Sequence, residues 1–124
     1  MGFQDDWMLR QIEMITRHVA MMIFHKRAVR YELSSSEMLS ETDELHLKLD
    51  GLIREGKLCE AEDLLFDNLM FTDRYIELAV DFYTRLNQLT DQELENGGFT
   101  RDEVYDGYVE ILMLLGVPID EFVA

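Results

Sequence analysis

The chain has 124 residues, of which 48% are hydrophobic, and it carries a formal net charge of −15 at pH 7. This length fits one domain, and the apolar content excludes a disordered chain because it is ample for a hydrophobic core. The acidic balance argues against a nucleic-acid-binding protein, since contact with phosphates depends on clustered lysines and arginines.

The sequence also bears on the cellular compartment. Its single cysteine, Cys59, cannot form an internal disulfide, which favours a reducing cytoplasm. The first residues are acidic where a secretory signal requires a basic start and a long apolar run. The longest strongly apolar run, residues 19–24, is far too short to span a bilayer. We therefore expect a cytoplasmic protein without a membrane-spanning helix.

Charge is distributed unevenly along the chain. Residues 1–30 hold five Lys or Arg against three acids, whereas residues 31–124 hold six against twenty-three. A basic segment attached to an acidic remainder indicates a surface that docks, whether onto the chain's own body, a second copy, a partner or a membrane.

The first predicted helix runs from about Asp5 to about Arg30. Acidic residues at its start and basic residues at its end suit the helix dipole. One apolar stripe comprises Met8, Ile12, Ile15, Val19, Met22 and Ile23. A second line widens it and comprises Trp7, Met14, Met21, Phe24 and Ala28. So wide an apolar surface predicts burial on more than one side of the helix.

The middle of the chain predicts a connection followed by a helical hairpin. The connection, residues 31–41, is expected to be loosest at Ser34–Ser36. The hairpin spans residues 42–69 and takes Ser40 or Thr42 as its cap. Its two helices are expected at about 43–55 and 58–69, on either side of a glycine turn.

The hairpin has the residue spacing of a tetratricopeptide-type repeat. The residues at that repeat's packing and turn positions are Leu45, Leu49, Leu52, Gly56, Leu58, Ala61 and Leu65. No second copy follows at the repeat period, and a solenoid needs about three stacked units. We therefore expect one such hairpin within a helical bundle.

Residues 72–115 predict the C-terminal helices. Two threonines followed three positions later by glutamate, at Thr90 and Thr100, form capping boxes that begin helices. The helices are expected at about 73–89, in a short turn after Thr90, and at about 101–115. The fold class is therefore an all-α single domain over residues 1–124, a bundle of about five main helices.

No constellation of residues predicts catalysis, a metal site or a cofactor. His18 and His25 have no carboxylate four residues away, and His46 with Asp43 three residues before it resembles only half of a helical di-metal site. The acids near residue 95 do not match a calcium loop. Cys59 has no histidine positioned near it by sequence. The enzyme or small-ligand alternative is a pocket among Tyr75, Tyr83, Tyr105, Tyr108 and His46.

Three stretches carry a resemblance to a known family. They are QDDWMLRQIE at 4–13, GKLCEAE at 56–62, and FYTRLN at 82–87 leading to FTRDE at 99–103. Together they resemble a group of small uncharacterised bacterial proteins that is classed only as a domain of unknown function. The resemblance spans nearly the whole chain and is most specific at 4–13. It implies a small cytoplasmic helical protein and brings no activity, cofactor or site residue with it.

These observations favour a non-enzymatic interaction or scaffold domain that self-associates or binds a protein partner. The candidate interaction residues are Trp7, Arg10, Met14, Arg17, Met21, Phe24 and Arg27. The apolar members would supply contact area and the arginines would meet acidic surfaces. Two alternatives remain for the segment 5–30: it lies on a membrane surface, or it is the central core helix. Anionic lipid would repel the acidic remainder of the chain.

Overall fold

The computed structural model describes residues 3–26, 28–34 and 38–119, and within these ranges the chain is helical and contains no strand. The helices are α1 (Phe3–Phe24), α2 (Glu41–Arg54), α3 (Leu58–Asp67), α4 (Asp73–Gln88), α5 (Asp91–Asn96) and α6 (Arg101–Leu114). The predicted all-α fold is therefore confirmed, and the short turn expected after Thr90 is α5.

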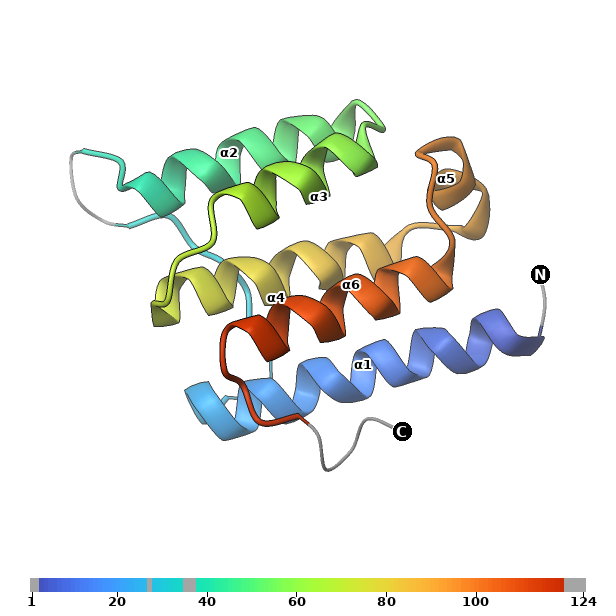
Figure 1. Cartoon of the computed structure of the whole chain (residues 1–124), viewed down its shortest axis with the longest axis horizontal. Coiled ribbons are helices and arrows are strands. Elements are labelled where there is room, and N and C mark those ends of the chain that lie inside the picture. Colours follow the sequence, from blue (N-terminus) through green and yellow to red (C-terminus); the bar gives the residue numbers. More distant parts are fainter. Residues whose placement is uncertain (1–2, 27, 35–37, 120–124) are drawn as a thin grey trace.

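The helices lie in three layers (Figure 1). The hairpin of α2 and α3 forms one outer layer, α4 and α6 form the middle layer, and α1 forms the other outer layer. α4 packs against α6, α1 and α2, so it is the central helix. Its inward residues, including Ala79, Phe82 and Leu86, are buried. In this arrangement, none of the described helices covers one long side of α1.

Hydrogen bonds from side chains fix the helix starts. Ser40 is the N-cap of α2 and forms a capping box with Asp43, which decides between the two caps left open by the sequence. Thr90 and Thr100 form the predicted capping boxes of α5 and α6. Thr72 caps α4 by accepting a hydrogen bond from the backbone N–H of Tyr75.

Glycines with positive φ follow α2, α5 and α6, and the one after α2, Gly56, is the predicted glycine turn. Gly56 has φ 77°, and the N–H of Lys57 donates to the carbonyl of Leu52 at 2.9 Å. Gly116 has φ 78°, and the N–H of Val117 donates to the carbonyl of Leu112 at 2.9 Å. Both are Schellman-type ends, in which a left-handed residue lets the chain satisfy the last carbonyls.

The predicted end of the first helix is wrong. α1 ends at Phe24, six residues before Arg30, because His25 takes a left-handed conformation with φ 54°. The N–H of Lys26 then donates to the carbonyl of Ala20 at 3.0 Å. Beyond this point the chain alternates between exposed and buried residues, so Val29 and Tyr31 enter the core from an extended segment. Lys26 and Arg30, which were expected to complete the helix, therefore lie outside it.

Candidate functional site

The outward side of α1 carries a row of exposed apolar side chains. Trp7, Met14 and Met21 are 47%, 49% and 56% exposed, and they are spaced by seven residues. Side chains seven residues apart lie almost above one another on a helix, so the three form a single stripe. The inward side of the same helix is fully packed, with Ile12, Ile15, Val19 and Ala20 buried. Hereafter this row is called the α1 stripe.

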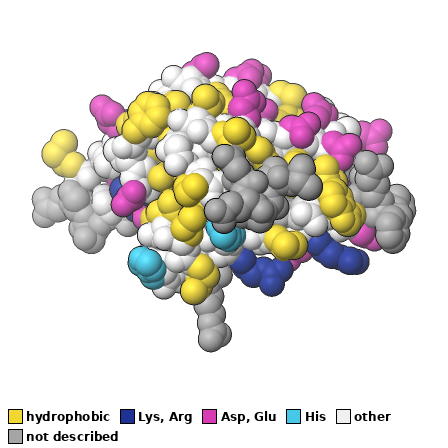
Figure 2. All heavy atoms as spheres, turned by 60° about the horizontal axis from the view of Figure 1, so that its bottom comes forward, with side chains coloured by type: hydrophobic (Ala, Val, Ile, Leu, Met, Phe, Trp, Pro, Cys, Tyr) yellow, Lys and Arg dark blue, Asp and Glu magenta, His cyan; other side chains and the backbone are white. Residues whose placement is uncertain are grey.

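Two of the predicted arginines lie beside the stripe. Arg10 and Arg17 are exposed, and neither forms an ion pair with another residue of the described ranges. Figure 2 shows most of the visible Lys and Arg side chains along the lower part of the view, and most Asp and Glu side chains along the upper part. Phe24 is half-buried against the core and does not belong to the stripe. Arg27 lies outside the described residues.

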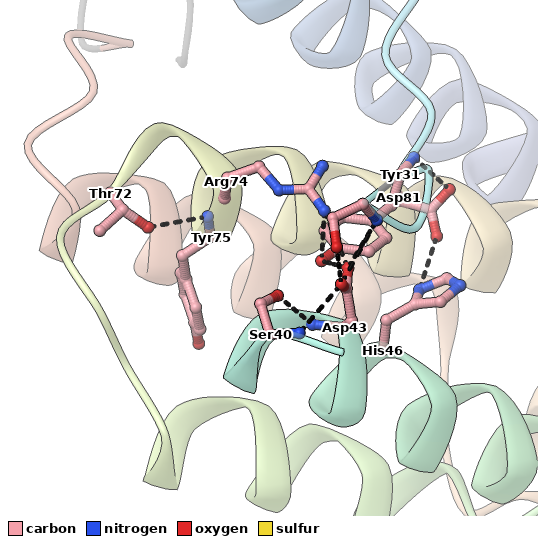
Figure 3. Close-up of polar contacts among 9 residues, drawn as sticks. Tyr31, Ser40, Asp43, His46, Thr72, Arg74, Tyr75 and Asp81 are labelled. Carbon is pink, nitrogen blue, oxygen red and sulfur yellow. Dashed lines mark hydrogen bonds and ion pairs between the residues drawn. The ribbon is translucent and has the colours of Figure 1, made fainter. Parts of the chain in front are cut away.

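A second feature is a buried carboxylate that ties the segment after α1 to α2 and α4 (Figure 3). Asp43 is fully buried and accepts hydrogen bonds from the Tyr31 hydroxyl at 2.6 Å, the Ser34 hydroxyl at 2.6 Å and Nη2 of Arg74 at 2.9 Å. The backbone N–H groups of Ser40, at 3.1 Å, and of Ser34, at 3.3 Å, also donate to this carboxylate. The hydrogen bonds from Ser34 and Tyr31 hold the pKa of Asp43 well below its usual range. Ser34, which the sequence places at the loosest point of the connection, is therefore anchored.

Tyr31 links this carboxylate to a polar cavity. The guanidinium of Arg74 lies 4.3 Å from the centre of the Tyr31 ring, and the His46 ring stacks on Tyr31 with centroids 4.7 Å apart. Burial and the hydrogen bond to Asp43 raise the pKa of Tyr31 to about 12, so its hydroxyl stays protonated and donates. The ring is thus fixed as one wall of the cavity.

The polar cavity has a volume of about 600 Å³ and lies between residues 28–31, α2 and α4. At its edge, Asp81 accepts a hydrogen bond from the Tyr31 N–H at 3.3 Å. The other oxygen of Asp81 lies 3.9 Å from Nδ1 of His46 and 4.0 Å from Nη1 of Arg85. Burial raises the pKa of Asp81 and lowers the pKa of His46, so His46 is neutral near pH 7.

A comparison with protein families assigns the chain. The model of a family of unknown function, DUF6483, matches residues 2–116. The chain belongs to DUF6483. No curated protein and no solved structure matches it. The resemblance to a family of unknown function is therefore confirmed, and the likeness of the hairpin to a tetratricopeptide repeat stays a prediction.

Three of the tyrosines proposed to line a pocket instead fill the core of this DUF6483 protein. Tyr75, Tyr83 and Tyr108 are fully buried, and the rings of Tyr83 and Tyr108 stack 5.1 Å apart. Their hydroxyls bond to the Leu65 carbonyl, to Glu62 at 2.6 Å and to Thr16 at 2.8 Å, respectively. His46 lines the polar cavity without them.

The structure also bears on the thiol, the metal sites and the membrane-spanning helices considered from the sequence. The Cys59 thiol is exposed and donates weakly to the carbonyl of Gly97 at 3.6 Å, and desolvation raises its pKa, which disfavours the reactive thiolate. Across the described ranges, no three His, Cys, Asp or Glu side chains are grouped so as to hold a metal ion. The helices in those ranges include none with the length and apolarity needed to cross a membrane.

Glu62 provides a pH-dependent contribution to stability. Burial raises its pKa above the ordinary value of 4.5, although the Tyr83 hydroxyl opposes this shift. A carboxyl with a raised pKa in the folded state stabilises the fold below its unfolded pKa, and that contribution is lost as pH rises through the folded value. Thermal unfolding from pH 4 to 8 should therefore show a shallower loss of stability toward neutral pH in Glu62→Gln than in the unsubstituted protein. Identical pH profiles of the two proteins would contradict this contribution of Glu62 to stability.

Proposed function

We propose that this DUF6483 protein is a non-enzymatic interaction domain that self-associates through the α1 stripe. The observation that carries the proposal is the exposure of Trp7, Met14 and Met21 in one row on a helix whose opposite side is fully packed. Aromatic residues and methionine are enriched at the centres of protein interfaces, because they offer large and adaptable apolar area. A cytoplasmic location accords with the single, unpaired Cys59.

Charges next to the stripe favour a second copy as the partner. Asp6, Glu13, Arg10 and Arg17 are all exposed on α1, and within the described residues none of them forms an ion pair. When two copies of α1 cross antiparallel, an alignment that places Asp6 opposite Arg17 also places Arg10 opposite Glu13. Both pairs share one midpoint, between Gln11 and Ile12. A single two-fold axis therefore generates four ion pairs, and a two-fold axis is the symmetry of a closed dimer.

The size of the contact sets the expected affinity. α1 has 22 residues, which corresponds to a length of ~33 Å. One helix of this length meeting its copy buries less area than a standard protein interface of ~800 Å² per partner. We therefore expect a weak dimer that forms at micromolar concentrations and loosens as salt screens the ion pairs.

Sedimentation velocity at low salt, over roughly 1–200 μM protein, tests the proposal by charge reversal. Arg17→Glu places two acids opposite each other and is expected to raise the dimer Kd at least ~10-fold. The double variant Asp6→Arg with Arg17→Glu restores opposite charges and the original net charge, so the dimer should return. Lys48→Glu, an exposed reversal of the same charge on α2, is the matched control and should leave the dimer unchanged.

The outcomes separate the alternatives. A monomer at every concentration would overturn self-association. A double variant that fails to recover the dimer would contradict the two-fold pairing of α1. Flotation of the monomeric protein with anionic liposomes would instead support the membrane-surface alternative, in which the same stripe faces lipid.

A further inference from the structure

The polar cavity between residues 28–31, α2 and α4 has a charge unlike that of the whole chain. Its charged lining consists of Arg30, Arg54 and Arg85 against Asp50 and Asp81. With His46 neutral, three cations and two carboxylates give a net charge of +1, on a chain whose net charge is −15. The linings of four other cavities on the molecule are neutral or negative by the same count. The cavity is therefore a local site of attraction for anions.

Two of the three guanidinium groups are held in place. Arg85 forms an ion pair with Asp50, and its Nη1 lies 4.0 Å from Asp81. Nε of Arg54 lies 3.1 Å from the second oxygen of Asp50. These contacts neutralise Asp50 and fix the direction of Arg85, so a ligand entering the cavity meets a cationic group that is already ordered.

The third guanidinium group remains available. Arg30 is exposed, lines the cavity and makes no ion pair within the described ranges, and its charge reaches Asp81 only at longer range. A cluster that served only to join α2 to α4 would be complete with Arg54, Arg85 and their two carboxylates. Arg30 adds a positive charge that this structural role does not need.

We propose that the polar cavity binds the oxyanion group, a carboxylate or a phosphate, of a small molecule, with Arg30 as its main binding residue. The planar guanidinium fork matches both groups and binds them through paired charge-assisted hydrogen bonds. Thr84 and Gln88, which also line the cavity, supply neutral polar groups beside it. The apolar side chains of Ala28 and Val29 bound the same space, so the ligand carries a small organic body as well as its charge.

Amide chemical shifts of the full-length, nitrogen-15-labelled protein test this site. The protein is titrated separately with sodium phosphate and with sodium succinate, while sodium chloride keeps the ionic strength constant. We expect saturable shifts at residues 28–31 and along the second half of α4 with at least one of the two probes. The probe that saturates identifies the group as phosphate or carboxylate.

Two charge-removing variants serve as test and control. Arg30→Gln removes the available guanidinium and should raise the Kd of the bound probe roughly 10-fold or more. Lys48→Gln removes the same charge from an exposed position on α2, outside both the cavity and α1, and should leave that Kd unchanged. Both side chains are exposed, so both variants should keep the fold, which the same spectra verify. Shifts that grow linearly for both probes, or an equal Kd in Arg30→Gln and the unsubstituted protein, would overturn the proposal. Neither result depends on whether α1 mediates self-association.

Discussion

Replacing Arg101 by alanine is expected to lower the free energy of unfolding by about 3–5 kcal/mol, because it leaves several buried polar groups without a partner. Arg101 is 4% exposed at the start of α6. Its guanidinium donates to the carbonyls of Asn87 at 2.8 Å and Leu89 at 3.0 Å, and to the carboxylate of Asp91 at 2.7 Å. The Arg101 side chain therefore donates hydrogen bonds both to the last carbonyls of α4 and to a carboxylate at the start of α5.

Urea unfolding of the variants measures this effect. Arg101→Lys keeps the charge, but an ammonium group lacks the planar fork of donors that contacts all three acceptors. We therefore expect it to recover only part of the lost free energy of unfolding. Arg54→Ala is the control, because the Arg54 side chain is 77% exposed. Its effect should stay within about 0.5 kcal/mol. A loss below about 1 kcal/mol in Arg101→Ala would show that the junction is held by apolar packing instead.

The parts of the fold that the sequence predicted correctly depend on local chemistry. The capping boxes at Thr90 and Thr100 and the glycine end of α2 at Gly56 were all identified from residues within one helical turn. A cap is satisfied by neighbours in the chain, so its residue pattern is visible without knowledge of the packing. The number and type of the helices followed from these ends and from the apolar periodicity between them.

The error at the end of α1 has a different origin. Basic residues after Phe24 suit a helix end, and they were assigned to one. However, residues 28–31 alternate between exposed and buried, which is the period of an extended segment. In the sequence, the available signal was the charged Arg30 between Val29 and Tyr31. The reason for the extended segment lies far along the chain, since Tyr31 is held by Asp43 on α2 and Asp81 on α4.

The two candidate sites also differ in how far local sequence could predict them. Trp7, Met14 and Met21 were identifiable because one helix carries all three, although their exposure depends on which sides of α1 the other helices cover. The polar cavity was missed because Arg30, Asp50 and Asp81 come from three separate segments. Its one local signal is the pair Asp81 and Arg85, two charged residues four apart in a stretch of α4, residues 78–86, that is otherwise apolar except for Thr84.

Two glycine-to-alanine substitutions are expected to change stability in opposite directions. Alanine normally stabilises a helix interior by roughly 0.5–1 kcal/mol relative to glycine. Gly51 lies inside α2, and a Cβ built there meets no atom within 4 Å. Gly51→Ala should therefore raise the free energy of unfolding by about that amount.

Gly107→Ala should instead lower the free energy of unfolding by about 1–3 kcal/mol, since overpacking outweighs the gain in helix propensity. Gly107 is buried on α6, where a Cβ would lie 2.7 Å from the Tyr83 hydroxyl and would also overlap the Glu62 carboxylate. Glu62 can rotate away, but Tyr83 then loses its hydrogen-bond partner while its buried ring, stacked on Tyr108, cannot follow. Urea unfolding of both variants compares one chemical change at two sites. Stabilisation by both would show that α6 can move away from α3 and α4 without loss.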